Sequence, residues 1–386
     1  MRQLKIIQII SSPWWTGAAE PALFLTKGLG DRGHELHFIC EAGDNLEKQA
    51  KGAGYPRVED VVPTRSLNPS RVWAAINSLA TLIDKVDADI IHTHLSSDNW
   101  LSFFAIRRAR KKPKLVRTIH HIRAAKASYF NKYLLARSMD AVIGVNNHIA
   151  GLLKTQIEVP PSQLHMVRGG IDIVRFHPPS IVSKVNGRDI LALPDKALLI
   201  GIVSRLAPDR GFMNLLDAFK IVSTGSPQAH LVIVGKGEYL PSIKERVGAL
   251  GLKDRVHFPG FIEDDLPEVL SAIDIFTLMA PGSKGTSRAL LEAMAMGLPT
   301  VVTSHNGLDE VVRDTVTSYV VPPNNPGALA AGIQGLVADK GKRIQFGRAG
   351  RQRVERLFHN GYRAEMVENI YAQILEISPS PKDLRE

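Results

Sequence analysis

The stretch 197-ALLIGIVSRLAPDRGFMNLLDAFKIV-222 decides the fold. Its first part, ALLIGIVS, is an almost continuous apolar run, which predicts a strand buried on both faces, as in a parallel sheet. A polar turn follows, and a helical pattern begins at Gly211. A buried strand followed by a turn and a helix is part of a βαβ unit. The stretch therefore predicts an α/β domain built on a parallel sheet.

The same strand-then-helix pattern recurs along the chain. In the first half we expect strands at residues 4–10, 35–40, 88–94, 114–119, 141–146 and 164–169. In the second half we expect them at 197–204, 229–235, 255–260, 273–279, 299–304 and 317–322. Helical runs, such as 19–33 and 211–222, separate most of these strands. Two Rossmann-like domains, with parallel sheets facing across a cleft, are the simplest α/β architecture for this pattern.

The boundary between the two domains is expected in a stretch without a sustained period. Residues 172–196 contain a Pro pair and no regular apolar spacing, so we interpret them as a linker. We therefore expect an N-terminal domain at residues 1–175, an interdomain linker at 176–196 and a C-terminal domain at 197–360. The last segment, 361–386, contains an amphipathic helix, which we expect to pack back on the N-terminal domain.

Composition restricts the class of protein. Charged residues make up 22% and hydrophobic residues 44% of the chain, which is typical of a folded protein and not of a disordered one. The single cysteine, Cys40, excludes a disulfide within the chain and indicates a reducing compartment. We find no apolar run of a membrane span's length, and we interpret the first residues, MRQLKIIQIISS, as a strand and not a signal peptide.

The net charge of +10 is concentrated in the first half of the chain. Residues 1–180 contain 24 Lys and Arg against 15 Asp and Glu, whereas residues 181–386 contain 24 against 23. The densest run is 107-RRARKKPKLVR-117. Such a run fits an anionic partner, which includes a membrane surface, a phosphorylated glycolipid or a nucleic acid; the alternative is a solvated helix end.

Two helix starts in the second half carry the residues of an anion site. Arg205 and Arg210 flank the turn that enters the helix at Gly211, and this arrangement suits a diphosphate; the alternative is two solvent-exposed arginines. The second start lies within 280-APGSKGTSRALLEAMAMGLPTVV-302, where Gly297 and Pro299 are expected to end the helix. Cations at a helix N-terminus oppose the helix dipole, so we expect a bound anion there. The residues involved are Lys284, Gly285, Thr286, Ser287 and Arg288.

Glu292 lies one turn after Arg288 on the same predicted helix. Its carboxylate has two interpretations: it accepts the two hydroxyls of a ribose, or it forms an i,i+4 ion pair with Arg288. Other chemistry is poorly supported, because we find no GxGxxG after a strand, no Walker lysine motif, no GxSxG and no spacing typical of a zinc site.

Four motifs of the second half, in order, carry a resemblance. SRLAPDRG (204–211), VGKGE (234–238), HFPGF (257–261) and KGTSRALLEAMAMGLPTVVT (284–303) resemble the retaining nucleotide-sugar glycosyltransferases of family four, which have the GT-B fold. In the first half, SSPWWTGAAE (11–20), DIIHTHL (89–95) and VRTIHH (116–121) resemble that family's first loop and its acceptor-domain strand ends. The resemblance covers almost the whole chain.

The resemblance implies a role for each matching residue. Arg205 and Arg210 would hold the donor diphosphate, and Glu292 would bind the ribose. His120 would lie near the reacting carbon and hydrogen-bond the donor sugar. The remaining donor-binding residues would be Gly17, Lys236, Glu238, Phe261, Gly285, Thr286, Ser287 and Arg288. Lys284 stands where the family usually has an acidic residue that touches the donor sugar, so we expect it to affect the choice of donor.

The implied reaction is transfer of a sugar from a nucleotide diphosphate to an acceptor, with retention at the anomeric carbon and without a metal ion or other cofactor. The basic first half suits an anionic glycan or glycolipid acceptor of cell-envelope synthesis, such as a lipopolysaccharide. We expect acceptor contacts from Trp14, Trp15, Arg107, Arg108, Lys111, Lys112 and Arg123. Ordinary packing under a loop is the alternative for the two tryptophans.

We expect the protein in the cytoplasm, attached peripherally to the inner face of the cytoplasmic membrane. Three other hypotheses remain open. A sugar-nucleotide epimerase has a similar two-domain shape, and a nucleotide-sugar-binding protein with altered catalysis would account for Lys284. A nucleic-acid binder would account for the basic first half, but no nucleic-acid-binding module is recognisable, so we expect no nucleic-acid partner.

Overall fold

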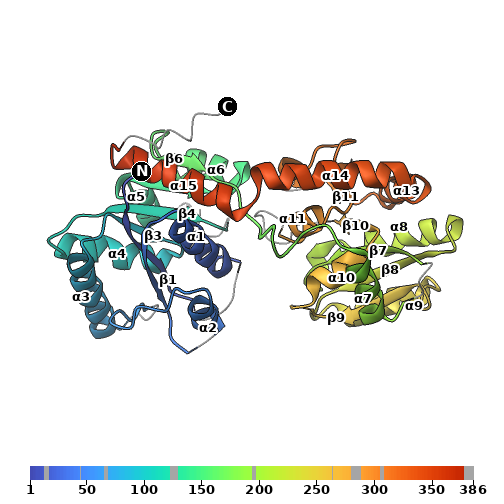
Figure 1. Ribbon diagram of the computed structural model, residues 1–386, viewed down its shortest axis with the longest axis horizontal. Coiled ribbons are helices and arrows are strands. Elements are labelled where there is room, and N and C mark those ends of the chain that lie inside the picture. The colour runs from blue at the N-terminus through green and yellow to red at the C-terminus, as the bar shows by residue number, and fades with distance from the viewer. Residues whose placement is uncertain are drawn as a thin grey trace. The chain divides into compact units, whose positions relative to one another are not determined.

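The computed structural model describes residues 1–12, 17–43, 45–64, 68–121, 129–193, 197–262, 264–279, 288–304 and 308–377. The chain forms two compact units (Figure 1). The first consists of Met1–Gly170 together with Asn360–Glu386, and the second consists of Ile171–His359. The chain thus enters the second unit once and returns to the first for its last helix.

The first unit contains a six-stranded sheet in the order β2-β1-β3-β4-β5-β6. All of its neighbouring strands are parallel. The strands are β1 (Lys5–Ile10), β2 (Glu35–Cys40), β3 (Ile90–Thr93), β4 (Lys114–Ile119), β5 (Ala141–Gly144) and β6 (Leu164–Met166). The helices are α1 (Ala19–Asp31), α2 (Asn45–Gly52), α3 (Pro69–Val86), α4 (Ser96–Arg108), α5 (Tyr129–Arg137), α6 (Asn147–Leu152), the π-helical turn η2 (Leu153–Ile157) and α15 (Asn360–Ile374).

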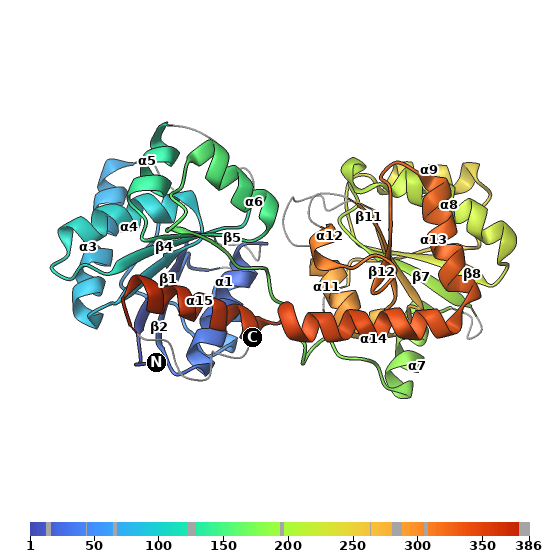
Figure 2. The ribbon, with the colours of Figure 1, turned by 90° about the horizontal axis from the view of Figure 1, so that it is seen from above.

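Strand β1 shows why helices cover both faces of this sheet. Side chains alternate between the two faces of a strand, and in β1 both sets are mostly apolar. Ile7 and Ile9 pack in one buried cluster with residues of α3 and α4. Leu4 and Ile6 pack in another with residues of α1 and α15. Figure 2 shows α15 beside α1 on this second face. Because helices cover both faces of the sheet, its strands are mostly apolar, and a polar side chain within a strand therefore needs a separate explanation.

The second unit contains a parallel sheet in the order β12-β11-β10-β7-β8-β9. Its strands are β7 (Leu198–Val203), β8 (Ala229–Val234), β9 (Val256–Gly260), β10 (Ile275–Leu278), β11 (Thr300–Thr303) and β12 (Ser318–Val321). The helices are α7 (Ile181–Leu191), the 3₁₀ turn η3 (Pro208–Arg210), α8 (Phe212–Gly225), α9 (Leu240–Ala249), α10 (Leu266–Ala272), α11 (Arg288–Ala295), α12 (Leu308–Val311), α13 (Pro326–Ala338) and α14 (Lys340–Leu357).

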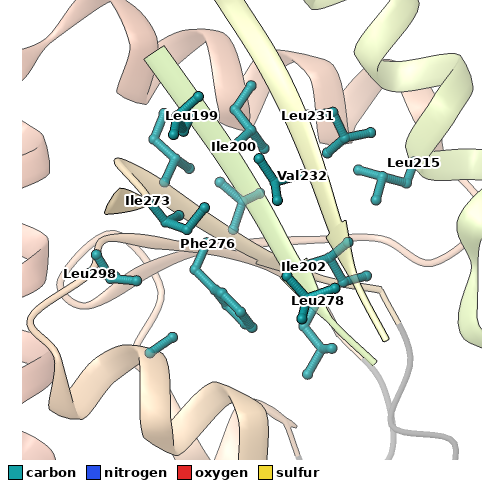
Figure 3. Packing of buried hydrophobic residues seen from close by; sticks show 14 of the residues in the cluster. Leu199, Ile200, Ile202, Leu215, Leu231, Val232, Ile273, Phe276, Leu278 and Leu298 are labelled. Carbon is teal, nitrogen blue, oxygen red and sulfur yellow. The ribbon is translucent and has the colours of Figure 1, made fainter. Parts of the chain in front are cut away.

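The core of the second unit lies around its central strands β7, β8 and β10. Leu199, Ile200 and Phe276 are fully buried there, together with Leu215 of α8 (Figure 3). Apolar burial of this kind stabilises a domain by about 25 cal/mol per Å². The apolar run that opens the second half in sequence is therefore the centre of this unit.

Both sheets agree with the sequence. Each of the twelve expected strands is present in the described residues, with ends that differ from the expected ones by at most three residues. Continuous Val, Ile and Leu runs are a strong signal because a strand covered on both faces has apolar side chains at nearly every position.

The expected linker was wrong. Residues 176–196 belong to the second unit, which begins at Ile171. They contain α7, whose first turn is capped by Ser180: its Oγ accepts a hydrogen bond from the Ser183 amide at 3.1 Å. Helix α7 packs against α10 so closely that a Cβ on Gly187 would lie 2.0 Å from the Glu268 carbonyl oxygen. The Pro pair thus precedes a packed helix, and the chain changes units at 170/171 and 359/360.

Helix α15 returns to the first unit. Ala364, Val367, Ile370 and Tyr371 are buried in the cluster that this helix shares with α1 and the sheet. Gly28 of α1 allows the close approach, because a Cβ there would lie 2.8 Å from the Cβ of Ala364. Residues 378–386 lie outside the described part.

Candidate functional site

The turn after β7 is held in a conformation that only glycine tolerates well. Gly211, which begins α8, has φ of 74°, in the left-handed region. A Cβ at this position would also lie 2.5 Å from Cβ of Met279. The turn therefore approaches the end of β10 closely, and it places Arg210 and the first amides of α8 at the carboxyl edge of the sheet. Ligands of open α/β sheets bind at this edge.

The two arginines of this turn are in different environments. The Arg205 side chain is 60% exposed and its Nη2 lies 4.0 Å from Oδ1 of Asp209. The Arg210 side chain is only 17% exposed, and its Nε lies 3.4 Å from the same oxygen. That Nε is buried and makes no hydrogen bond of good geometry with a described residue. Burial lowers the pKa of Arg210, and Asp209 acts in the opposite direction.

A second loop of the same edge, after β8, is tied to the first by its backbone. The Leu206 amide donates to the Lys236 carbonyl at 3.0 Å, and the Tyr239 amide donates to the Leu206 carbonyl at 3.2 Å. A Cβ on Gly235 would lie 1.9 Å from the Ser204 carbonyl oxygen. The sequence VGKGE therefore needs its glycines for packing against SRLAPDRG.

The expected donor-binding residues of this second loop are exposed. Lys236 Nζ lies 4.2 Å from the ring centroid of Phe261, which follows β9 and is itself exposed. Glu238 is exposed in the same loop. The loop thus offers an exposed aromatic ring with a cation over it, next to the turn that carries Arg205.

Helix α11 provides a buried carboxylate. Glu292 is 3% exposed and accepts a hydrogen bond from Arg288 Nε at 2.6 Å. Burial raises the pKa of Glu292, whereas Arg288 and Arg175 lower it. The i,i+4 ion pair that we considered for Glu292 is therefore present.

The expected end of this helix is confirmed. Gly297 has φ of 75°, and its amide donates to the Met294 carbonyl at 3.0 Å.

In the first unit, two histidines that follow neighbouring strands lie together. His94 follows β3 and His120 follows β4, and His94 Nδ1 lies 3.0 Å from His120 Nε2. His94 Nε2 lies 2.8 Å from Oε1 of Gln8, in β1. Burial lowers the pKa of both imidazoles well below the usual range, and positive groups that include Arg363 and Arg117 lower it further. His120 is therefore a neutral imidazole at neutral pH.

Gly17 is exposed, and a Cβ there would meet no atom within 4 Å. Packing against the described residues therefore does not require glycine at this position, and the space beside it is open to a ligand. Several expected site residues lie outside the described part of the chain. They are Trp14, Trp15, Arg123, Lys284, Gly285, Thr286 and Ser287.

Family models match both units. The model described as Glycosyl transferases group 1 matches residues 184–353, and the model described as Glycosyltransferase Family 4 matches residues 15–175. The chain belongs to the group 1 glycosyltransferases. The resemblance inferred from the motifs is thereby confirmed, and a glycosyltransferase is the kind of enzyme that this family comprises.

Relatives extend over the whole chain. The UDP-Gal:alpha-D-GlcNAc-diphosphoundecaprenol alpha-1,3-galactosyltransferase of Escherichia coli is 24% identical over 97% of this chain and 98% of its own length. A glycosyltransferase structure from Rickettsia africae has a TM-score of 0.85 at 20% identity and covers 98% of this chain and 100% of its own. The structure of Anabaena HepE with UDP and glucose has a TM-score of 0.77 at 21% identity, covering 95% and 99%. The fold class, GT-B, is confirmed.

The cations expected to contact the acceptor of this glycosyltransferase lie at the end of α4. Arg107 and Arg108 are exposed, and their guanidinium carbons lie 3.5 Å from the ring centroid of Phe103 and 4.8 Å from that of Trp73. Lys111 pairs with Asp87 at 2.8 Å. Lys112 donates to three carbonyls at the end of α4, so it caps that helix. The first two arginines are therefore the better candidates for contact with a ligand.

An exposed aromatic surface surrounds these arginines, which we name the α3–α5 surface. It consists of the exposed side chains of Trp73, Phe104, Arg107, Arg108, Tyr129 and Tyr133. Trp100 and Phe103 connect its members through ring contacts. We did not expect this surface, although Trp73 and Phe104 follow the spacing of exposed helix positions.

None of the described helices combines the length and the apolar character needed to cross a bilayer.

Three buried polar side chains that bond or electrostatically affect the histidines of this sheet were not expected from the sequence. Gln8 and Arg117 are buried in β1 and β4, and Tyr371 is buried on α15. Each is a polar side chain within an otherwise apolar segment: KIIQII (5–10), KLVRTI (114–119) and the buried side of the last helix. A polar residue in a strand covered on both faces was the available signal.

Proposed function

We propose that this glycosyltransferase moves a hexosyl group from a nucleoside diphosphate sugar to a glycan or glycolipid acceptor, with retention at the anomeric carbon. The observation that carries the proposal is the turn after β7. Arg210 there is a largely buried guanidinium whose Nε has no hydrogen-bond partner of good geometry among the described residues. It stands beside Arg205 at a helix start, which is an arrangement that binds a diphosphate.

The chemistry follows from where charge develops. The bond between the anomeric carbon and the diphosphate oxygen breaks, and negative charge grows on the leaving diphosphate. Arg205, Arg210 and the first amides of α8 stabilise that charge. The acceptor oxygen forms the new bond on the same face of the sugar and passes its proton to the departing phosphate. This scheme requires no protein nucleophile.

Guanidinium groups supply the positive charge in this scheme, so we propose a reaction without a metal cofactor. Glu292 binds the ribose hydroxyls, and its contact with Arg288 orients the carboxylate. His120 hydrogen-bonds a hydroxyl of the sugar. Lys284 and the helix-start residues Gly285, Thr286 and Ser287 enter this proposal from the sequence alone.

The acceptor proposal rests on charge and on relatives. The Escherichia coli relative is named for a diphosphoundecaprenol acceptor, which is an anionic lipid-linked sugar. The α3–α5 surface combines cations with exposed aromatic rings, a combination that suits anionic headgroups and the interface of a bilayer. We therefore propose a role in cell-envelope synthesis, with peripheral attachment to the inner face of the cytoplasmic membrane.

The test of this function is a panel of nucleotide sugars. The purified protein is incubated with UDP-glucose, UDP-galactose and GDP-mannose, with and without EDTA, and nucleoside diphosphate release is followed. We expect slow release from one donor, undiminished by EDTA, and a changed donor preference in Lys284→Glu. Isomerisation of the sugar without release would indicate an epimerase, and binding without turnover, even with acceptor extracts, would indicate a binding protein.

A further inference from the structure

One face of the first sheet changes from apolar to polar along its strands. Toward the amino ends, this face carries Leu4, Ile6, Ile90 and Val116, which pack in the cluster shared with α15. Toward the carboxyl ends it carries Gln8, His92, His94, Thr118 and His120. Buried polar groups are costly unless they are hydrogen-bonded, and apolar side chains would stabilise the sheet as well or better. Their placement at the ligand-binding edge therefore favours a role in the reaction.

The polar side chains form two hydrogen-bonded rows. In the first, Gln8 Oε1 lies 2.8 Å from His94 Nε2, and His94 Nδ1 lies 3.0 Å from His120 Nε2. In the second, the Tyr371 hydroxyl lies 2.6 Å from His92 Nδ1, and His92 Nε2 lies 2.7 Å from Thr118 Oγ1. The rings of His92 and His94 stack at 4.7 Å, so the two rows support each other.

We infer that Gln8 and His94 are positioning residues that hold His120 in its Nε2–H tautomer and leave Nδ1 as the acceptor for a sugar hydroxyl. The inference rests on the proposed function, in which His120 binds the sugar. Neither Gln8 nor His94 touches the substrate in this scheme; both act through His120.

The direction of the row decides the tautomer. A neutral imidazole donates through one nitrogen and accepts through the other. Gln8 Oε1 accepts from His94 Nε2, so His94 Nδ1 is an acceptor and His120 Nε2 must donate to it. Burial raises the pKa of the Tyr371 hydroxyl, and the Gln8 side chain acts in the opposite direction. In the structure the Gln8 amide has its oxygen toward His94, and its Nε2 is buried without a hydrogen-bond partner of good geometry among the described residues.

The surroundings of His120 keep the row neutral. The positive or titratable groups that lower its pKa are Arg363, Arg117, His92 and His121, and His94 contacts its ring directly. Both arginines are buried, with pKa lowered to about 10 by burial, so they are charged at neutral pH and oppose a second positive charge. A protonated His120 would lose its acceptor nitrogen, so the row and the arginines act in the same direction.

The direct test is the nitrogen-15 spectrum of the histidine-labelled protein, which distinguishes the two tautomers and the imidazolium. We expect His120 as the Nε2–H tautomer at neutral pH in the wild type, and a mixture of tautomers in Gln8→Met. Thr118→Val is the matched control: it removes a buried hydrogen bond from the other row and should leave the His120 tautomer unchanged. An Nδ1–H tautomer in the wild type, or no change in Gln8→Met, would overturn the inference.

Kinetics provides the second readout. We expect Gln8→Met to lower kcat/KM for donor turnover on the order of tenfold, since one buried hydrogen bond contributes about that factor, and Thr118→Val to lower it much less. Affinity for UDP alone should be unchanged in both. Wild-type kcat/KM in a stably folded Gln8→Met would refute a positioning role.

Gln8→Glu gives an independent pH readout. It keeps the acceptor oxygen, so the tautomer should be retained, but its charge favours the imidazolium. Activity should therefore fall at a higher pH than in the wild type as the pH is lowered; an unchanged profile would contradict the inference. If no donor is turned over, the proposed function fails, while the spectra still decide the tautomer.

Discussion

Arg205 and Arg210 have the same charge but different surroundings. Arg205 is well hydrated, so an anion that binds it replaces water contacts at little gain. Arg210 is largely buried, with its Nε without a hydrogen-bond partner of good geometry in the described part of the protein. A charge in such surroundings interacts more strongly with an anion because the local dielectric is lower. Arg210 should therefore stabilise the leaving diphosphate more than Arg205 does.

Arg210→Ala should lower kcat/KM for donor turnover about 100-fold to 1,000-fold, in the range found when one preorganised donor is removed from a developing anion. Arg205→Ala should lower kcat/KM for donor turnover by a smaller factor than Arg210→Ala does. Arg246→Ala, which removes a guanidinium paired with Asp217 elsewhere in the same unit, is the matched control. Equal rates for Arg210→Ala and Arg246→Ala would show that Arg210 does not act on the diphosphate.

Glu292 should show a conflict between stability and function. Burial raises its pKa, so the folded state favours the protonated form. Its contribution to stability is then fully present below the pKa of the unfolded chain and is lost as the pH rises through the folded pKa. Glu292→Gln should therefore raise the Tm above the wild-type value at pH 8, with a smaller difference at pH 4, while weakening UDP binding about tenfold. Calorimetry and UDP titration check both; tighter UDP binding in the variant would contradict the ribose role.

The apolar periodicity of the strands and helices explains which of them the sequence predicts well. Strands covered on both faces are apolar at most positions, so all twelve were predicted. Helix α7 was missed because it is short and much of it is exposed, which gives no strong apolar period. The Pro pair before it then suggested a linker. The turn that we propose for the diphosphate was predictable because its Gly and Arg residues are local in the sequence. The row from Gln8 to His120 was not, because it depends on three strands meeting in a sheet.

Gly187 tests whether α7 is an integral part of the second unit. A Cβ there would lie 2.0 Å from a backbone oxygen of α10, so Gly187→Ala should destabilise the protein by about 1–3 kcal/mol, as overpacking does. Gly225→Ala on α8 is the control, because the added Cβ meets only the far end of Gln334, at 3.7 Å. Denaturant unfolding measures both. If the two variants are equally stable, α7 does not pack as described.

The two halves of the chain differ in net charge. The excess of cations lies in residues 1–180, and the α3–α5 surface presents part of it together with aromatic rings. The second half is nearly neutral, so the anion site that we propose there depends on the local arrangement of Arg205 and Arg210 and not on bulk charge. Residues 1–180 are therefore suited to an anionic surface, and the second half is suited to the small anionic donor that we propose.

Vesicle binding tests the role of the α3–α5 surface. The protein should sediment with phosphatidylglycerol vesicles at low salt, much less with phosphatidylcholine vesicles, and less again as salt rises. The double variant Trp73→Ala/Phe104→Ala should bind more weakly, whereas Ile344→Ala, at an exposed apolar position of the second unit, should bind as the wild type does. Equal binding of both variants would exclude this surface from membrane contact.

We propose that the protein transfers a sugar from a nucleotide sugar with retention at the anomeric carbon. Proton NMR of the first sugar released from an α-linked donor such as UDP-glucose, recorded before mutarotation, reads the anomeric configuration together with nucleotide release. We expect UDP and the α-anomer to appear together. Release of the β-anomer first, or isomerised sugar without UDP, would contradict the account.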